Sequence, residues 1–221
     1  VNARSRDWDP ELIALIGEGG KWLQPIAAPG TRLGHWISPS GRQVSVILPA
    51  THDTGSAIVA TPLSGRGAAY ISSGTWSLVG VERKAPLTDA AALAANLTNE
   101  GGVEGTWRLL KNVMGLWLVQ GLQALWPQLG FAELVAQAEQ AEPFAYLIYP
   151  NDERFLNPAC MRSAIQHFCQ ETGQGTPQTP GELVRCVLDS LALCYDQVLR
   201  ELENVTGESI TRLHIVGGGS Q

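Results

Sequence analysis

The sequence has no long hydrophobic run, no cluster of basic residues and no secretion signal. No apolar stretch approaches the roughly 18 residues that a transmembrane helix needs, and no basic segment followed by an apolar one opens the chain. Acidic residues outnumber basic residues by 21 to 15, which gives a net charge of −6. Proteins that bind nucleic acids usually carry basic surfaces, so this charge argues against that function. We therefore expect a cytoplasmic protein without membrane or nucleic-acid partners. Small anionic ligands are compatible with this charge, because backbone amides bind anions.

Cysteine is scarce as well. The chain has four cysteines, all in its last third, at Cys160, Cys169, Cys186 and Cys194. None forms a Cys-x-x-Cys pair or has a histidine at zinc-finger spacing, so no structural zinc site is predicted. The first interpretation is reduced thiols in a cytosolic protein. The alternative is one disulfide between Cys169 and Cys186, which would join two predicted helices across a loop.

The composition is that of a folded α/β protein. The chain has 221 residues, of which 44% are hydrophobic, enough for one large domain or two small ones. Strand and helix patterns are mixed along it. A change of composition near residues 61–65 predicts a domain boundary. Since the chain begins with Val1 and stops in a glycine-rich turn, we expect an internal fragment of a longer polypeptide.

Capping signals and apolar periodicity predict the helices. Asp9 can cap a helix that stops at Gly17. Thr179 and Glu182 form a capping-box pattern, and the apolar stripe that follows stops at Gly207. Further helices are predicted to start at Ala57 and to cover 113–126, 133–141 and 157–171.

Short apolar or alternating runs predict the strands. They cover 44–50, 96–98, 106–110 and 213–216, and a longer run at 68–81 reads as two strands around a polar turn. The strand at 213–216 is expected to be buried. Residues 17–43 are rich in glycine and proline and are predicted to form a loop.

Asp53 is the first candidate for chemistry. It follows the predicted strand at 44–50, and ligands gather at the carboxyl ends of strands in open α/β sheets. A carboxylate there can take a proton from a substrate hydroxyl. The alternative is that Asp53 caps a helix. Its neighbour His52 is unremarkable by itself.

Two glycine-containing turns are candidates for phosphate binding. In Ser72-Ser73-Gly74-Thr75, backbone amides and hydroxyls can converge on an anion, although many hairpins have polar tips. The three glycines 217–219 allow a ligand to approach the backbone closely, but they match neither the dinucleotide fingerprint nor the Walker A pattern. A tight turn is the alternative there.

Two polar residues complete the candidates. Asn112 would cap the predicted helix at 113–126 or contact a ligand. Gln120, about two turns further along, would lie on a neighbouring flank, or simply be solvated.

Taken in order, these segments resemble the FGGY family of carbohydrate kinases. The similar segments are THDT (51–54), ISSGTWS (71–77), NLTNEGG (96–102), LKNVMGLW (110–117) and LHIVGGG (213–219). Two of them, NLTNEGG and LKNVMGLW, are most similar to the bacterial members that act on L-rhamnulose. The resemblance runs over nearly the whole chain and is more specific than any single segment.

The resemblance implies a two-domain, actin-like kinase with ribonuclease-H-like halves. Residues 1–60 would be the tail of the N-terminal domain, and residues 61–221 most of the C-terminal domain. ATP, with Mg²⁺, and the sugar would meet in the cleft between the halves. The reaction implied is phosphoryl transfer to the 1-hydroxyl of L-rhamnulose, with no metal held by this part of the chain.

The resemblance also implies roles for single residues. Asp53 would be the catalytic base, with His52 and Thr54 beside it at the sugar and Asn112 on the substrate. The nucleotide side would be formed by Thr75, Gln120 and Gly218, with Thr75 at the phosphates.

The family's first phosphate-binding loop has no counterpart in this sequence. We therefore expect the 221 residues alone to bind ATP weakly and to have no useful turnover. Two other functions are kept open. One is a kinase of this family for another ketose or polyol, and the other is a non-catalytic, actin-like domain that binds a nucleotide or sugar. The oligomeric state is not predicted.

Overall fold

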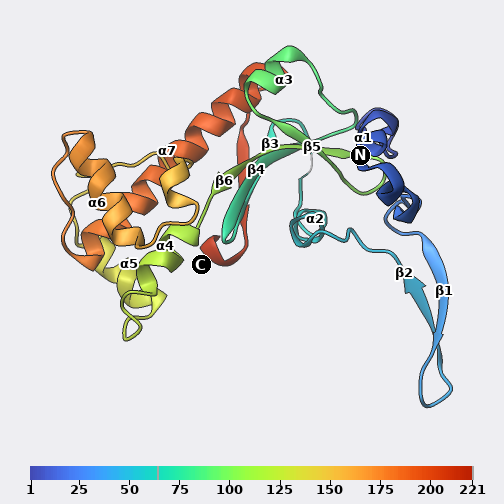
Figure 1. Cartoon of the computed structure of the whole chain (residues 1–221), viewed down its shortest axis with the longest axis horizontal. Coiled ribbons are helices and arrows are strands. Elements are labelled where there is room, and N and C mark those ends of the chain that lie inside the picture. Colours follow the sequence, from blue (N-terminus) through green and yellow to red (C-terminus); the bar gives the residue numbers. More distant parts are fainter. Residues whose placement is uncertain (64, 221) are drawn as a thin grey trace.

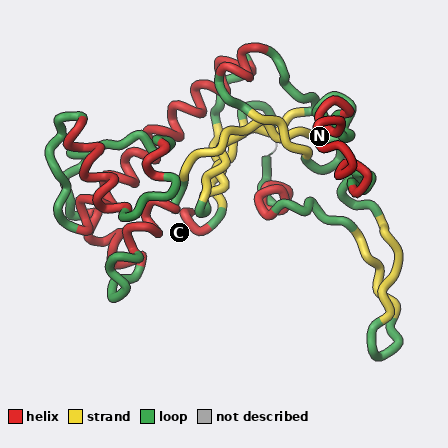
Figure 2. The backbone as a smooth tube through the Cα atoms, viewed as in Figure 1, coloured by secondary structure: helices red, strands yellow, loops and turns green. Residues whose placement is uncertain are grey.

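The computed structural model describes residues 1–63 and 65–220, and it is a mixed α/β fold as predicted. Figure 1 labels the elements and Figure 2 colours them by type. The strands are β1 (Arg32–Ile37), β2 (Gln43–Ile47), β3 (Ala68–Ser73), β4 (Trp76–Arg83), β5 (Thr98–Gly101), β6 (Trp107–Met114) and β7 (Arg212–Val216). The α-helices are α1 (Pro10–Ile16), α2 (Asp53–Val59), α3 (Ala90–Ala94), α4 (Trp117–Gln123), α5 (Phe131–Glu139), α6 (Met161–Glu171) and α7 (Pro180–Thr206). Short 3₁₀ helices are η1 (Gly17–Trp22), η2 (Glu153–Phe155) and η3 (Gly218–Ser220).

Five strands form one sheet in the order β5-β6-β4-β3-β7. Neighbouring strands are antiparallel except for β3 and β7, which pair parallel with Ser72 opposite Val216. Because β3 and β7 run in the same direction, both end at the same edge of the sheet. At this edge β3 turns into β4, and β7 runs on into the glycines 217–219. Two segments far apart in the sequence are thus brought together.

Helix α7 covers one face of this sheet (Figure 1). Tyr195 of α7 shares a hydrogen bond with Ser77 of β4 at 2.6 Å, and Glu201 pairs with Lys111 of β6 at 2.7 Å. The apolar side chains of α7 pack with those of the sheet and of α4, α5 and α6 in one hydrophobic core. Although α7 has 27 residues, none of the helices in the described ranges is apolar enough at sufficient length to cross a membrane.

Side-chain alternation along β6 separates the two faces of the sheet. Lys111 and Val113 point towards α7, since Lys111 pairs with Glu201 and Val113 lies in the core. Arg108 and Asn112 therefore point to the opposite face. Helix α2 lies on that opposite face, where a Cβ atom on Gly55 would be 3.4 Å from Nη2 of Arg108.

The capping box of α7 forms as predicted. The Thr179 hydroxyl accepts a hydrogen bond from the Glu182 amide, and the Glu182 carboxylate accepts one from the Thr179 amide. Hydrogen bonds from the backbone of Thr179 and then of Gln178 hold the pKa of Glu182 below its usual value. The helix ends at Gly207, which adopts the left-handed conformation at φ 69°.

The predicted cap of α1 is also confirmed. The Asp9 side chain accepts hydrogen bonds from the amides of Glu11 and Leu12, and Gly17 ends the helix at φ 59°. The apolar side chains of this helix do not pack into the core, however, and Leu15 is 84% exposed.

The helix predicted over 113–126 is wrong at its start. Val113 and Met114 belong to β6, where they pair with Ser77 and Trp76 of β4, and α4 begins only at Trp117. Pairing with β4 outweighs the local helical period of these residues, because tertiary context overrides weak helix propensity. Asn112 is consequently a strand residue and not a helix cap.

The prediction of a loop over residues 17–43 is also wrong in part. Gly17–Trp22 is a 3₁₀ helix, and Arg32–Ile37 forms β1, antiparallel to β2 with an irregularity between Arg32 and Gly34. That irregularity interrupts the alternation by which a strand is recognised. The β1–β2 hairpin projects away from the sheet, as Figure 1 shows.

Other elements also differ from the prediction: α6 begins at Met161 rather than near residue 157, and β5 covers Thr98–Gly101 rather than 96–98. Helix α2 begins at Asp53 rather than at Ala57, so the polar run after β2 is its first turn. Strand β7 is not buried: it lies at the edge of the sheet, and Leu213 and Ile215 are 40% and 49% exposed.

The cysteines are free thiols, as the first interpretation predicts. Cys169 and Cys186 lie close enough to share a hydrogen bond, but no disulfide joins them here. Contact with Cys169, together with burial, raises the pKa of Cys186, so this thiol stays protonated at neutral pH.

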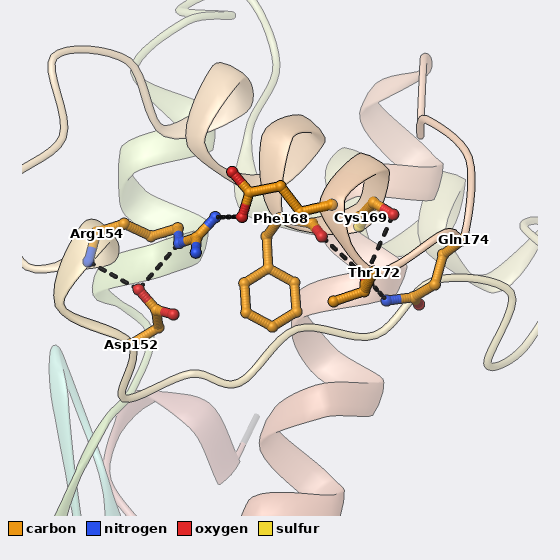
Figure 3. A network of polar contacts seen from close by, with 7 residues as sticks. Asp152, Arg154, Phe168, Cys169, Thr172 and Gln174 are labelled. Carbon is orange, nitrogen blue, oxygen red and sulfur yellow. Dashed lines mark hydrogen bonds and ion pairs between the residues drawn. The ribbon is translucent and has the colours of Figure 1, made fainter.

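A polar network fixes α6 to the segment before it (Figure 3). Arg154 donates from Nε to Asp152 at 2.9 Å and from Nη1 to Glu171 at 2.7 Å, and its guanidinium lies 4.9 Å from the centre of the Phe168 ring. Hydrogen bonds from Arg154, the backbone N–H first, hold the pKa of Asp152 below its usual value. Every charge in this network has a partner, which favours a structural role.

The capping box gives a direct test of how α7 is held. Thr179→Ala should lower the free energy of unfolding by about 1 kcal/mol, because the Glu182 amide loses its acceptor. Thr206→Ala, in the last turn of the same helix, is the control. Its hydroxyl donates back to the Leu202 carbonyl at 2.7 Å and accepts a longer hydrogen bond from the Glu208 amide at 3.3 Å, beyond the end of the helix, so the change should cost clearly less than Thr179→Ala. Urea denaturation measures both, and equal losses would contradict the assignment.

Candidate functional site

Asp53 presents an exposed carboxylate in the first turn of α2. Its side chain is 94% exposed, and Oδ1 lies 3.3 Å from Nε2 of His52 and 2.9 Å from the amide nitrogen of Thr54, which donates to it. The N-cap position belongs to His52, whose side chain makes no capping hydrogen bond. The sequence suggested that Asp53 either caps the helix or lies at the end of a strand. In the structure it does neither, because it is the first residue of α2. Its Oδ2 has no hydrogen bond within the described residues and can receive a substrate hydroxyl.

Thr54 is oriented differently from its neighbours. It is 7% exposed, whereas His52 and Asp53 are exposed. Of the three residues expected beside the sugar, two therefore present side chains that a ligand can reach in this structure.

Two residues that sequence reasoning missed lie behind His52. Oε2 of Glu100 is 3.9 Å from Nδ1 of His52 and accepts a hydrogen bond from Nη2 of Arg108 at 2.8 Å. A hollow of about 150 Å³ is lined by His52, Gly55, Gly101 and Arg108, together with residues before α2. The β5–β6 hairpin could have indicated the pairing of Glu100 with Arg108, but no local signal links either to His52.

Thr75 and Gln120 come together at the edge of the sheet where β3 ends. Nε2 of Gln120 donates to Oγ1 of Thr75 at 3.3 Å. The turn is joined to the start of α4 by backbone hydrogen bonds from Leu116 to Gly74 and from Trp117 to Thr75, each 3.0 Å long. Thr75 is exposed and Gln120 half-buried, so this pair is available to a ligand.

The glycines after β7 close onto the same turn. A Cβ on Gly217 would lie 2.4 Å from the carbonyl oxygen of Ser73, and one on Gly219 would lie 2.1 Å from its Oγ. Only residues without a side chain allow this approach. Gly218 differs, since nothing lies within 4 Å of its Cβ position. It offers an open stretch of backbone between two glycines that approach Ser73, which fits the phosphates of a nucleotide.

Asn112 lies on the face of the sheet that also holds α2. It is exposed and sits opposite Leu78 of β4. The expectation that Asn112 and Gln120 lie two turns apart on one helix is therefore wrong, because Asn112 belongs to β6 and Gln120 to α4.

The candidate residues form two groups in this structure. Thr75, Gln120 and Gly218 gather where β3 and β7 end, and His52 and Asp53 lie together at the start of α2. Within the described ranges, no hydrogen bond or ion pair joins one group to the other. No group of three His, Cys, Asp or Glu side chains there could hold a metal ion.

Comparison with known proteins finds relatives of this chain. The model for the C-terminal domain of the FGGY family of carbohydrate kinases matches residues 69–221. A rhamnulokinase from Enterobacter sp. (strain 638) is 50% identical over all 221 residues of the chain, which span 45% of that protein.

Solved structures show the same fold at lower identity. A xylulose kinase from Rhodospirillum rubrum superposes with a TM-score of 0.64 at 19% identity, covering 100% of this chain and 45% of that one. A ligand-bound xylulose kinase from Lactobacillus acidophilus gives a TM-score of 0.66 at 17% identity, covering 98% of this chain and 45% of that one. The chain thus spans about half the length of the relatives it matches.

The approach of the glycines to Ser73 can be tested by adding single methyl groups. Gly217→Ala should destabilise the fold by about 1–3 kcal/mol, because its Cβ would meet a backbone oxygen at 2.4 Å and its φ is 94°. Gly218→Ala, the matched control, should change the free energy of unfolding by less than about 0.5 kcal/mol. Thermal unfolding of both variants measures this, and equal effects would contradict the geometry.

Proposed function

Because this chain belongs to the FGGY family of carbohydrate kinases, we propose that it serves the ATP-dependent phosphorylation of L-rhamnulose. The phosphate would be placed on the 1-hydroxyl, giving L-rhamnulose 1-phosphate and ADP. The observation that carries this proposal is 50% identity, along the whole chain, to a protein named rhamnulokinase. The NLTNEGG segment, which supplies Glu100 beside His52, adds support for this sugar.

Residues 1–60 are assigned to the tail of an N-terminal kinase domain, and residues 61–221 to most of the C-terminal domain. The family match over 69–221 supports the second assignment. The exposed apolar side chains of α1 and of the β1–β2 hairpin support the first, because large apolar surfaces usually have a partner.

Asp53 is the general base of the proposed reaction. Its free Oδ2 accepts the proton of the sugar 1-hydroxyl while that oxygen attacks the γ-phosphorus of ATP. The bond from the γ-phosphorus to the bridging oxygen breaks, and ADP leaves. Little covalent chemistry is required of the protein, so positioning and charge stabilisation dominate.

The two groups of residues divide the substrates between them. Thr75, Gln120 and Gly218 hold ATP, whose Mg²⁺ arrives with the nucleotide and neutralises phosphate charge. His52 and Asn112 present their side chains to the sugar, and Thr54, whose side chain is buried here, is placed at the sugar through its neighbour Asp53. The position of Asn112 on the sheet face that also bears α2 supports its place beside Asp53.

The assignment is tested by ADP release from ATP and Mg²⁺ on the complete polypeptide, with a panel of ketoses and polyols. The highest kcat/KM is expected for L-rhamnulose. A clearly higher kcat/KM for another sugar, such as D-xylulose, would keep the assignment as a kinase but contradict the assignment of L-rhamnulose as its substrate. Nucleotide binding without turnover on any sugar would favour a non-catalytic domain instead.

The role of Asp53 gives a sharper prediction. Asp53→Asn should lower kcat by at least about 100-fold, because the amide cannot take the proton, and should leave ADP affinity unchanged. Asp89→Asn is the matched control, since Asp89 caps α3 through its side chain and asparagine caps equally well. ADP release and calorimetry measure the two quantities. A fully active Asp53→Asn enzyme would contradict the base assignment.

The division of substrates predicts opposite effects for two variants. Thr75→Val should raise the KM for ATP about tenfold through the lost hydroxyl contact, with little change in the KM for sugar. Asn112→Ala should raise the KM for sugar and spare that for ATP. Steady-state kinetics with each substrate varied in turn checks both, and exchanged or shared effects would show that the assignment is wrong.

A further inference from the structure

We propose that Glu100 and Arg108 are positioning residues for the base Asp53, acting through the imidazole of His52. This inference rests on the proposed kinase function, in which Asp53 is the base. Neither residue touches the reacting atoms in this proposal. Their effect is to fix the orientation of a ring that lies against the Asp53 carboxylate.

The link begins with a buried cation. Arg108 is 3% exposed and stands directly opposite Glu100 in the β5–β6 register and Glu82 in the β4–β6 register. Among the described residues, its ion-pair partner is Glu100, through Oε2 and Nη2 at 2.8 Å. Nε and Nη1 of Arg108 are buried without a hydrogen-bond partner in the described residues. Because a buried charge needs a counter-ion, Glu100 is held in place by Arg108.

Beside this pair lies a second buried polar group. The hydroxyl of Tyr70 is buried and has no hydrogen-bond partner within the described ranges, and burial raises the pKa of this phenol. A neutral phenol cannot serve as a counter-ion for Arg108. Among the described residues, the carboxylate that forms an ion pair with Arg108 is therefore that of Glu100.

The same carboxylate oxygen then faces His52. Oε2 of Glu100 lies 3.9 Å from Nδ1 of His52, and Nε2 on the other side of the ring lies 3.3 Å from Oδ1 of Asp53. The first distance is too long for a hydrogen bond but within the range of an ion pair, and such contacts often tighten when substrate binds. Each ring nitrogen thus faces one carboxylate. This places the ring in one orientation and leaves Oδ2 of Asp53 for the sugar hydroxyl.

Arg108 supports the same helix turn by packing. A Cβ on Gly55 would lie 3.4 Å from Nη2 and 3.7 Å from Cζ of Arg108, so the first turn of α2 rests on the guanidinium. Arg108 therefore supports Asp53 in two ways. It packs against Gly55 in the first turn of α2, and it holds Glu100, which faces His52. A base must be held close to its productive geometry to act, which gives this support its effect on rate.

The first test is Glu100→Gln in the complete polypeptide, with Glu201→Gln as the matched control. Glu201 also pairs with a β6 cation, Lys111, at 2.7 Å, but on the face turned towards α7. Glu100→Gln should lower kcat about tenfold with little change in the KM for ATP, and Glu201→Gln should leave kcat within twofold. Glu100→Asp keeps a counter-ion for Arg108 and should restore folding if Glu100→Gln unfolds. Its shorter side chain should still lower kcat.

A double-mutant cycle with His52 separates positioning from a general structural effect. If Glu100 acts through His52, then His52→Asn combined with Glu100→Gln should be no slower than His52→Asn alone. Fully additive losses in kcat, or an unchanged kcat in both folded Glu100 variants, would overturn the proposal.

A third measurement does not depend on turnover. Ring ¹⁵N shifts of His52, identified by their loss in His52→Asn, report the environment and tautomer of the imidazole by long-range ¹H–¹⁵N NMR. Glu100→Gln should move them, and Glu201→Gln should not. Unmoved shifts would overturn the link even in an active enzyme. Moved shifts in a protein without sugar-dependent turnover would keep the link while the proposed function fails.

Discussion

The packing of α7 against one face of the five-stranded sheet is the constraint on which the rest of the structure depends. It is fixed by polar contacts at two strands, from Tyr195 to Ser77 and from Glu201 to Lys111, and by the shared hydrophobic core. Because this face is used for packing, the candidate polar residues lie on the opposite face and at the edge where β3 and β7 end. Within β6, neighbouring side chains point to opposite faces of the sheet. Lys111 pairs with Glu201 of α7, whereas Asn112 is exposed on the other face.

The two groups of candidate residues are held by different means. The group formed by Thr75, Gln120 and Gly218 depends on close backbone approach, since the glycines on either side of Gly218 can approach Ser73 only without side chains. The group at α2 depends on charge, since His52 and Asp53 rest on a buried arginine and its carboxylate partner Glu100. Phosphoryl transfer needs both substrates in line and water excluded. A site divided in this way suits a kinase in which movement of one group towards the other completes the active site.

Sequence reasoning succeeded where a structure is decided locally. The caps at Asp9 and Thr179 and the stop at Gly207 form as expected, because each needs only neighbours within a few residues. It failed where distant partners decide: Val113 is a strand residue because β4 lies beside it. The THDT and GGG segments pointed to Asp53 and Gly218 through resemblance, but Glu100 and Arg108 went unnoticed, since their link to His52 exists only after α2 docks on the sheet.

The central claim is that these two groups belong to one active site. It is tested most directly by a crystal structure of the complete polypeptide with a non-hydrolysable ATP analogue and L-rhamnulose. The account predicts phosphates beside Thr75 and Gly218, and the sugar 1-hydroxyl between Asp53 and the γ-phosphate, with Glu100 still beside His52. A nucleotide bound away from the Ser73–Thr75 turn, or a sugar whose 1-hydroxyl does not reach Asp53, would contradict it.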